Sequence, residues 1–304
     1  MRVAVLGAGA VGCHYGGLLA RAGHDVMLIG RRTHVEAIRR DGLRMVWGDG
    51  REETVRVRAD DSAAAAAGAD WVLVTVKSQD THEAASQLAA HLSPGSLVLS
   101  LQNGVDNAEV LAERLAELGA DADVRVLPVV VYVATRMEGP GVVRHLGGGR
   151  LVVGAGPDAD AVRAAFEAAG DPVEIVPDVR VALWAKLVAN CVWNPLSAIT
   201  SAPYGRLAPI PGIDQVAADV IAECRAVARA DGVDLPADLE ASVSSLPQTM
   251  PDQLSSTQQD LVRGRRTEIE HLNGYVARRG AVLGVPTPVT SALAALVRAV
   301  EPRG

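Results

Sequence analysis

The sequence has few aromatic residues, few cysteines and no excess of positive charge. Only 3% of its 304 residues are aromatic and phenylalanine occurs once, which argues against a surface on which nucleic-acid bases stack. The formal net charge is −7, so the basic surface that binds nucleic acid or anionic lipid is missing. The three cysteines are widely spaced, which predicts no metal site and favours a reducing compartment over a disulfide framework.

The sequence also lacks a long apolar run. No stretch reaches the ~20 apolar residues of a membrane span, and the opening residues MRVAVLG do not have the successive regions of a signal peptide. We therefore expect a cytoplasmic protein with no membrane partner. Hydrophobic residues make up 49% of the chain, which is enough for a sizeable core in one large domain or two ordinary ones.

Short apolar runs alternate with alanine-rich segments in the first half of the chain. Four of these runs are typical of buried strands, and they span residues 2–7, 25–30, 71–76 and 96–101. Helical patterns lie between most of them. This alternation predicts a parallel sheet with helices on both faces.

The class of structure changes near residue 176. Two further strands are predicted at 124–135 and 141–155, without a long helix between them, and a helix follows at 157–170. Beyond Val176 only helical patterns remain, separated by proline and glycine. We predict an α/β fold in which residues 1–176 form a Rossmann-type NADP-binding domain and residues 177–304 form an all-helical domain for substrate binding and catalysis.

A glycine-rich motif, GAGAVG, follows the first predicted strand and opens a helical pattern. In a dinucleotide-binding turn the first glycine permits the tight turn, the second lets the backbone approach the pyrophosphate, and the third lets helix and strand pack closely. A purely structural turn is the alternative, but the strand before and the helix after favour the cofactor site. The candidate cofactor-binding residues here are Gly7, Ala8, Gly9, Ala10, Val11 and Gly12.

The second predicted strand ends in Gly30, Arg31 and Arg32 rather than in an acidic residue. An acid there would hold the ribose 2′-hydroxyl of NAD, whereas a guanidinium suits the 2′-phosphate of NADPH. A solvated arginine is the alternative interpretation. Lys77 and Asn103 follow the third and fourth strands, at the edge of the sheet where ligands bind, so we expect both to face cofactor or substrate.

A polar stripe runs along the most hydrophobic helical segment, WAKLVANCVWNPLSAIT. Lys186, Asn190 and Asn194 are four residues apart and share one face of a helix. Unpaired buried polar groups cost ~1–3 kcal/mol each, so a stripe that lines a substrate cleft explains all three residues. Contacts with backbone or water are the alternative. Pro195 predicts that the helix kinks or ends just after Asn194.

A second polar segment, residues 255–280, contains Ser256 and Glu268. Twelve residues of one straight helix would separate them by ~18 Å, too far to hold one small ligand. Thr267 and Glu270 form a capping-box pattern that predicts a second helix after Gly264. Two helix starts could then converge on one site, although Glu268 could equally serve only as a partner of the helix dipole.

The chain resembles the ketopantoate reductase (2-dehydropantoate 2-reductase) family over almost its full length. The resemblance rests on the motifs above together with QNG at 102–104, the segment 184–200 and SSTQQDLVRGRRTEIEHLNGY at 255–275. It implies NADPH-dependent reduction of 2-dehydropantoate to (R)-pantoate, a step toward pantothenate and coenzyme A. The last two segments are far more specific than the glycine motif.

The resemblance also implies roles for single residues. Lys186 would be the general acid that protonates the carbonyl oxygen, and Glu268 would hydrogen-bond and orient the substrate. Arg31 and Lys77 would bind the 2′-phosphate. Asn103 would lie between the nicotinamide and the substrate. Asn190 and Asn194 would hold the hydroxyl and the carbonyl of the substrate, and Ser256 would bind the substrate carboxylate.

The chain departs from the family pattern near the substrate end. Some members have an asparagine, used in the substrate site, where this chain has Tyr204, and many have an apolar pair in place of Thr257 and Gln258. These departures leave open another branched 2-keto acid as substrate. A non-enzymatic NADP(H)-sensing protein is a further alternative, against which the presence of both Lys186 and Glu268 argues. The oligomeric state stays open, and a homodimer is allowed.

Overall fold

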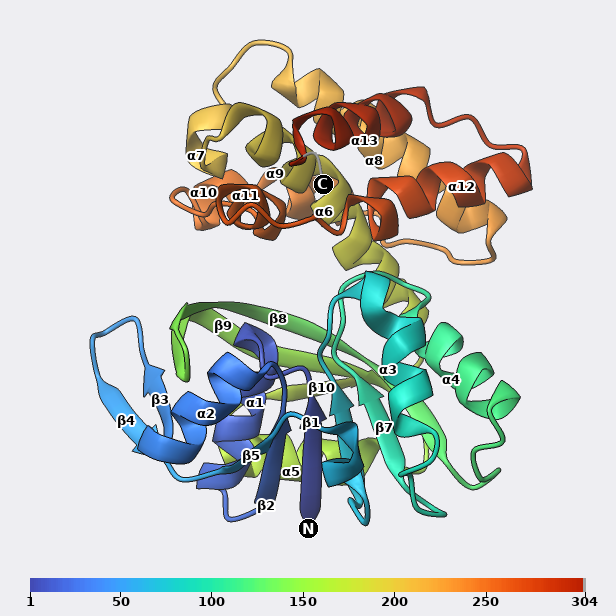
Figure 1. Ribbon diagram of the computed structural model, residues 1–304. Helices are drawn as coiled ribbons and strands as arrows, with labels where there is room; N and C mark the ends of the chain where they lie inside the picture. Colours follow the sequence, from blue (N-terminus) through green and yellow to red (C-terminus); the bar gives the residue numbers. More distant parts are fainter. Residues whose placement is uncertain (303–304) are drawn as a thin grey trace. The chain divides into compact units, whose positions relative to one another are not determined.

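The computed structural model describes residues 1–302, and the chain forms two compact units that divide between Val179 and Arg180 (Figure 1). The division lies just beyond residue 176, where the last strand of the chain ends.

A ten-stranded sheet forms the centre of the first unit, in the order β4-β3-β9-β8-β7-β6-β1-β2-β5, with β10 paired to β9. Its parallel part comprises β5 (Arg58–Asp60), β2 (Asp25–Ile29), β1 (Arg2–Leu6), β6 (Trp71–Val74), β7 (Leu97–Ser100) and the start of β8 (Arg125–Gly139). This arrangement confirms the predicted α/β class, because each of the four predicted apolar runs contains one of these parallel strands.

The rest of the sheet is mixed. β9 (Val142–Gly154) runs antiparallel to β8, and both β3 (Leu43–Val46) and β10 (Val173–Val176) pair with β9 in parallel. β4 (Glu52–Val55) is antiparallel to β3. The sequence patterns did not predict β3, β4 or β5. These strands have only three or four residues and several charged side chains, so they lack the continuous apolar signal of the central strands.

Helices cover both faces of this sheet (Figure 1). On one face lie α1 (Ala10–Arg21), α2 (Arg32–Asp41) and α5 (Ala159–Ala169), and on the other α3 (Thr81–Leu88), α4 (Asn107–Glu117) and the short 3₁₀ helix η1 (Ala63–Ala66). Successive side chains of a strand point to opposite faces. In β1, Val3 and Val5 therefore pack into the first core, whereas Ala4 and Leu6 pack into the second.

The second unit is helical, and residues 180–302 contain no strand. It comprises α6 (Val179–Thr200), α7 (Tyr204–Leu207), α8 (Ile213–Ala230), α9 (Leu239–Ser244), α10 (Leu246–Thr249), α11 (Ser256–Val262), η3 (Ile269–His271), α12 (Asn273–Leu283) and α13 (Pro288–Val300). Twelve side chains of α6 are buried, among them Trp184, Leu187 and Val188, so α6 supplies much of the core of this unit.

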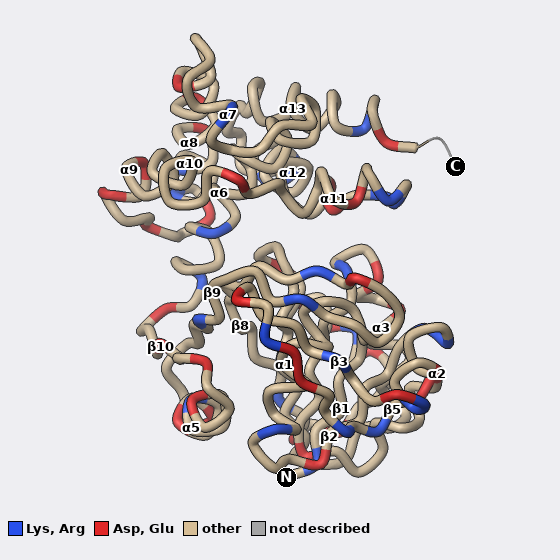
Figure 2. Tube along the Cα trace, turned by 90° about the vertical axis from the view of Figure 1, so that its left-hand side faces the viewer, with Lys and Arg blue, Asp and Glu red and all other residues tan. Residues whose placement is uncertain are grey.

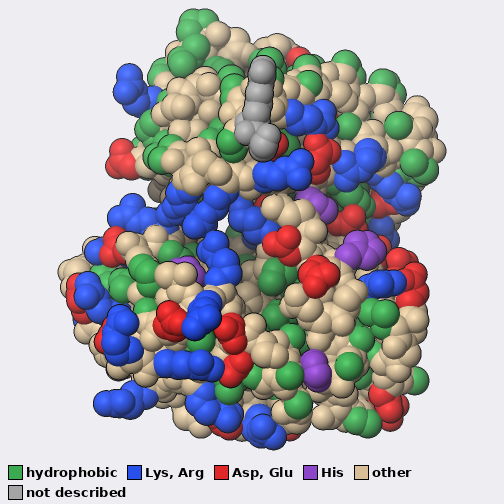
Figure 3. Space-filling model, in the orientation of Figure 1, with side chains coloured by type: hydrophobic (Ala, Val, Ile, Leu, Met, Phe, Trp, Pro, Cys, Tyr) green, Lys and Arg blue, Asp and Glu red, His purple; other side chains and the backbone are tan. Residues whose placement is uncertain are grey.

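Both units carry mixed charge. Basic and acidic residues are interspersed along the chain trace, for example in α2 (Figure 2), and the face drawn in Figure 3 shows both kinds of side chain on each unit. Within residues 1–302, no helix is long and apolar enough to cross a membrane, and no three His, Cys, Asp or Glu side chains are grouped to hold a metal ion.

The helix α6 does not end at Asn194, which was one of the two outcomes that Pro195 predicted. It continues to Thr200 with Pro195 inside it. Proline has no N–H, so the carbonyl of Cys191, four residues earlier, loses its helical donor. The side-chain Nδ2 of buried Asn273 donates to that carbonyl at 2.9 Å. The first residue of α12 thus replaces the hydrogen bond that Pro195 removes.

The predicted capping box of Thr267 and Glu270 is wrong. The Glu270 carboxylate pairs with Arg278 and Arg298. The N–H and hydroxyl of Thr267 both donate to Glu301, at 2.9 and 2.5 Å. A carboxylate from the end of α13 therefore occupies the position that the local pattern assigned to Glu270, and the segment before η3 is not helical.

The pairing of Asn273 with the Cys191 carbonyl predicts a specific energetic coupling to Pro195. Asn273→Ala leaves a buried carbonyl without a donor and should lower the free energy of unfolding by about 1–3 kcal/mol. In a Pro195→Ala background the restored N–H can bond to Cys191, so the same change should cost less. Urea unfolding followed by circular dichroism measures both costs, and equal costs in the two backgrounds would contradict the coupling.

Candidate active site

The turn between β1 and α1 has the geometry of a phosphate-binding loop. Gly7 has φ +113°, and a Cβ on it would lie 2.7 Å from the Val76 nitrogen. A Cβ on Gly12 would lie 2.2 Å from the Gly7 carbonyl oxygen, so helix and strand pack too closely for any side chain. A Cβ on Gly9 would meet nothing nearer than 3.9 Å. The backbone is therefore open at Gly9, where a ligand can approach it.

The start of α1 completes this anion site. The helix begins at Ala10 with neither an acidic residue in its first turn nor a side-chain cap. The first N–H groups of a helix have no partner within the helix, and the helix dipole places partial positive charge there. Together with the open backbone at Gly9, this helix start can bind a pyrophosphate.

The tip of β2 carries an available cation. A Cβ on Gly30 would lie 2.6 Å from the Ala8 Cβ, so the turn leaves no room for an acidic side chain at that position. Arg31 is exposed, and its guanidinium has no hydrogen bond or ion pair within residues 1–302. Its neighbour Arg32 instead pairs with Glu36 at 2.7 Å. Arg31 is therefore the arginine of this turn that can bind an external anion.

A buried polar network joins the loops that follow β6 and β7. The Ser78 hydroxyl donates to the Asn103 carbonyl at 2.7 Å, and Asn107 Nδ2 donates to Ser78 Oγ at 3.2 Å. The Thr81 hydroxyl lies 2.9 Å from Asn107 Oδ1 and accepts from Gln102 Nε2 at 2.8 Å. Sequence reasoning did not assign Ser78, Thr81, Gln102 or Asn107 to the site, although polar residues in the loops and helix starts that follow two buried strands were an available signal.

The network fixes the backbone on either side of two predicted residues. Lys77 is half-buried and directly precedes the 3₁₀ helix η2 (Ser78–Asp80). The Ser78 hydroxyl anchors the carbonyl of Asn103. The loop therefore holds the Asn103 side chain in a defined position. Both predicted residues therefore lie in ordered loops at the carboxyl edge of the parallel strands, the edge at which such sheets bind ligands.

In the helical unit, α6 carries the predicted polar stripe. Lys186 and Asn190 are half-buried and Asn194 is buried, whereas the adjoining faces hold core residues such as Leu187 and Cys191. The amide of Asn190 has no hydrogen-bond partner within residues 1–302. The stripe thus presents an ammonium and two amides along one line of a core helix.

Lys186 has a strongly shifted pKa. Burial disfavours the ammonium and lowers its pKa to about 8, although the neighbouring Glu268 carboxylate acts in the opposite direction and raises it. Desolvation therefore outweighs the charge partner. A lysine that titrates near pH 8 can give up a proton readily at physiological pH and take one back, as a general acid or base must.

The N-terminus of α11 docks against the same helix. Asn194 Nδ2 donates to Ser256 Oγ at 3.4 Å, and the Ser255 hydroxyl donates to the Asn194 carbonyl at 3.2 Å. Ser255 also caps α11 by accepting from the Gln258 N–H at 3.0 Å. The structure thus brings Ser256 to Asn194 and Glu268 into the electrostatic field of Lys186, within one compact unit.

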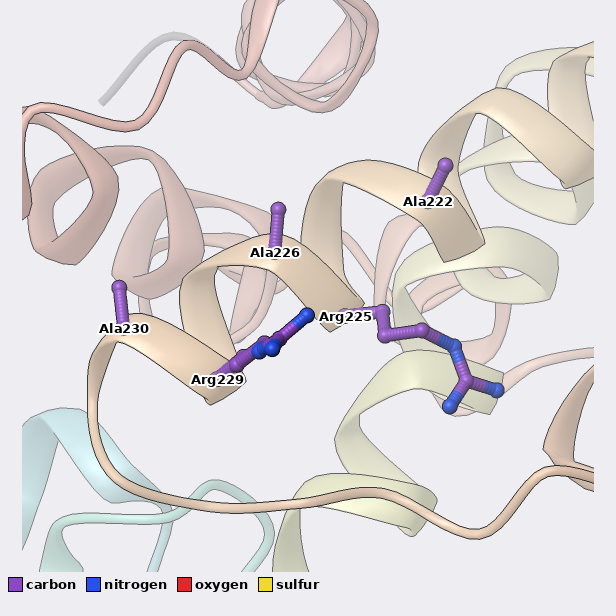
Figure 4. A pocket seen from close by; sticks show the side chains of 5 residues that line it. All are labelled: Ala222, Arg225, Ala226, Arg229 and Ala230. Carbon is purple, nitrogen blue, oxygen red and sulfur yellow. The ribbon is translucent and has the colours of Figure 1, made fainter.

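A separate hollow of about 530 Å³ lies along α8, and none of the predicted site residues lines it (Figure 4). Its lining consists of Ala222, Arg225, Ala226, Arg229 and Ala230. Arg225 is already used, because its guanidinium donates to the carbonyls of Leu235 and Pro236, both at 3.0 Å. This hollow therefore carries no cluster of groups suited to chemistry.

Comparison with known proteins covers both units. Residues 3–158 match the family model of ketopantoate reductase PanE/ApbA, and residues 178–301 match the model of its C-terminal region. A 2-dehydropantoate 2-reductase from Halobacterium salinarum is 35% identical over 100% of both chains.

Solved structures agree with this likeness. The crystal structure of a PanE/ApbA family ketopantoate reductase from Ralstonia eutropha JMP134 is 51% identical, with a TM-score of 0.93 over 99% of this chain and 98% of that chain. That of 2-dehydropantoate 2-reductase from Geobacter metallireducens GS-15 is 28% identical, with a TM-score of 0.90 over 99% of this chain and 100% of that one.

The surroundings of Lys186 predict its titration. Its amine should titrate near pH 8 rather than near the ordinary lysine value of 10.5, and Glu268→Gln should lower that pKa further because it removes the charge that favours the ammonium. Competitive acylation of Lys186 across a pH series, read by mass spectrometry, measures both values. Glu270→Gln is the matched control, since that carboxylate pairs with Arg278 and Arg298. An ordinary lysine titration would show the prediction to be wrong.

Proposed function

The chain belongs to the ketopantoate reductase (PanE/ApbA) family, and on this premise we propose that it reduces 2-dehydropantoate to (R)-pantoate with NADPH. The observation that carries the proposal is Lys186, a lysine with a pKa of about 8 on a stripe of amides in a core helix. Reduction of a keto acid needs a proton at the carbonyl oxygen, and such a lysine can supply it.

The first unit has the features that NADPH requires. The open backbone at Gly9 and the free start of α1 suit the pyrophosphate, and Arg31 with Lys77 would bind the 2′-phosphate. Asn103 would lie beside the nicotinamide. When bound, NADPH supplies the hydride that goes to the carbonyl carbon. We therefore assign cofactor binding to residues 1–176 and substrate binding and catalysis to residues 177–304.

The helical unit would bind and protonate the substrate. Lys186 would hydrogen-bond the carbonyl oxygen and pass its proton to that oxygen as negative charge develops there. Glu268 would orient the substrate and favour the protonated lysine. Asn190 and Asn194 would hold the substrate hydroxyl and carbonyl, and Ser256 would bind the carboxylate. A biosynthetic reduction of this kind is expected in the cytoplasm.

A second candidate substrate is another branched 2-keto acid. The observation that favours it is the polarity of the residues that replace the apolar pair of the family pattern. Thr257 and Gln258 are buried, and within residues 1–302 the Thr257 hydroxyl and the Gln258 carbonyl oxygen have no hydrogen-bond partner. Reduction of ketopantoate and reduction of this alternative keto acid would use the same cofactor, the same lysine and the same proton transfer.

Initial rates of NADPH oxidation over a panel of 2-keto acids test the proposed reaction. Ketopantoate should have the highest kcat/KM, and 2-ketoisovalerate, which lacks the hydroxymethyl group, should be poorer. Lys186→Ala should lower kcat at least about a hundredfold with NADPH affinity nearly unchanged. Because the acid must be protonated, kcat/KM for reduction should fall as the pH rises through about 8.

Three outcomes of these assays would count against the assignment. A Lys186→Ala variant with near-normal turnover would show that the proton comes from another group. An equal or higher kcat/KM for 2-ketoisovalerate would favour the second candidate substrate. NADPH binding without turnover of any keto acid would favour a sensor of NADP(H).

Arg31 predicts a preference for NADPH over NADH. Arg31→Ala removes a charge-assisted hydrogen bond to the 2′-phosphate and should raise the KM for NADPH roughly 10- to 100-fold while the KM for NADH barely changes. Arg32→Ala is the matched control, because Arg32 pairs with Glu36, and it should leave both KM values close to those of the unmodified protein. Equal use of the two cofactors by the unmodified protein would refute this preference.

A further inference from the structure

Tyr204 is buried beside the proposed substrate site. Its hydroxyl lies 3.4 Å from Asn194 Oδ1, and its ring lies 5.6 Å from the ring of Trp193. Trp193 is itself held, because its Nε1 donates to the Val243 carbonyl at 2.9 Å. The Tyr204 N–H donates to the Gln253 carbonyl at 3.1 Å. Backbone and ring contacts therefore fix where the hydroxyl lies.

The Tyr204 hydroxyl acts as a donor here. Burial raises its pKa, so the hydroxyl keeps its proton. The oxygen lone pairs of a phenol are delocalised into the ring, which makes a phenol a better donor than acceptor. An asparagine amide has an acceptor oxygen at one end and a donor nitrogen at the other. Donation to Asn194 Oδ1 therefore selects one of the two orientations of that amide.

This orientation sets the role of Ser256. With Oδ1 toward Tyr204, Asn194 directs Nδ2 toward Ser256 Oγ, 3.4 Å away, and Ser256 is the acceptor of that bond. Its own proton then points away from Asn194, and within residues 1–302 the Ser256 hydroxyl has no acceptor. Asn194 and Tyr204 are buried, whereas Ser256 is exposed. The chain of hydrogen bonds thus ends in an outward-facing donor.

We propose that Tyr204 is a positioning residue that, through Asn194, holds the Ser256 hydroxyl as a donor to the carboxylate of the keto acid. The inference rests on the proposed function and adds a residue to it. A carboxylate only accepts hydrogen bonds, so Ser256 is useful to it as a donor. If the Asn194 amide turned over, Ser256 would donate inward to Oδ1 and would present only lone pairs to the negative substrate.

The phenylalanine variant separates this role from simple packing. Tyr204→Phe keeps the ring against Trp193 but removes the donor that orients Asn194. The KM for ketopantoate should rise about tenfold, which is the usual effect of one lost hydrogen bond to a charged group. Turnover and the KM for NADPH should change less than about twofold, because Lys186 and the cofactor site are untouched.

A double-mutant cycle shows whether Tyr204 acts through Ser256. Ser256→Ala should raise the KM for ketopantoate by a similar factor, and adding Tyr204→Phe to it should cause no further rise. Tyr15→Phe, which removes a buried tyrosine hydroxyl from the first unit, is the matched control and should leave the KM unchanged. Thermal unfolding of each variant identifies any loss of stability.

The outcomes distinguish this inference from the proposed function. An unchanged KM in Tyr204→Phe, or additive effects of the two substitutions, would overturn the positioning role while the unmodified protein still reduces ketopantoate. A fall in turnover with an unchanged KM would also overturn it. If the unmodified protein reduces no 2-keto acid, the proposed function fails and the positioning role fails with it.

Discussion

The desolvation of Lys186, a half-buried residue of α6, is the constraint from which the proposed chemistry of the helical unit follows. Desolvation of an ammonium is costly, and here it lowers the pKa to about 8 even though the Glu268 carboxylate opposes the shift. The residue before Glu268, Thr267, is bound by Glu301 after α13. The end of the chain therefore helps to hold the segment that carries this carboxylate.

A core helix that carries polar side chains must also satisfy its backbone, and α6 does so with residues from two other segments. Asn273 replaces the hydrogen bond that Pro195 removes at Cys191, and Ser255 donates to the Asn194 carbonyl. Further along, the Ser197 hydroxyl accepts from the Ser255 N–H and donates to the Ala202 carbonyl. These bonds hold α11 and α12 against the stripe, so the groups that stabilise the helix are also those that place Ser256 next to Asn194.

The first unit meets a different requirement, which is to leave backbone exposed where a ligand must approach. The turn after β1 is tight because Gly7 and Gly12 have no side chains, and it is open at Gly9 for the same reason. The loops after β6 and β7 are instead held rigid by the hydrogen bonds of Ser78, Thr81 and Asn107. Glycines thus shape the turn where a ligand approaches the backbone, and a polar network restrains the loops after β6 and β7.

The sequence by itself determined the features that depend on neighbours along the chain. Continuous apolar runs identified the parallel strands, the glycine spacing identified the turn, the missing acid before Arg31 indicated the cofactor, and the four-residue spacing placed Lys186, Asn190 and Asn194 on one stripe. Each of these signals follows from a local period or from the backbone freedom of a single residue type. The family resemblance supplied the roles of the residues.

Only the tertiary structure decided the features that depend on residues far apart in the chain. The short charged strands form because other strands offer them partners: β9 pairs with β3, β3 pairs with β4, and β2 pairs with β5. Pro195 does not end its helix because the Asn273 side chain donates the hydrogen bond that the missing N–H would have made. Thr267 is bound by Glu301 rather than by Glu270, three residues away. The pKa of Lys186 depends on how far the fold removes its amine from water and on the nearby Glu268 carboxylate. Hydrogen bonds and desolvation depend on which residues lie close together in space, and the spacing of residues along the sequence does not show this.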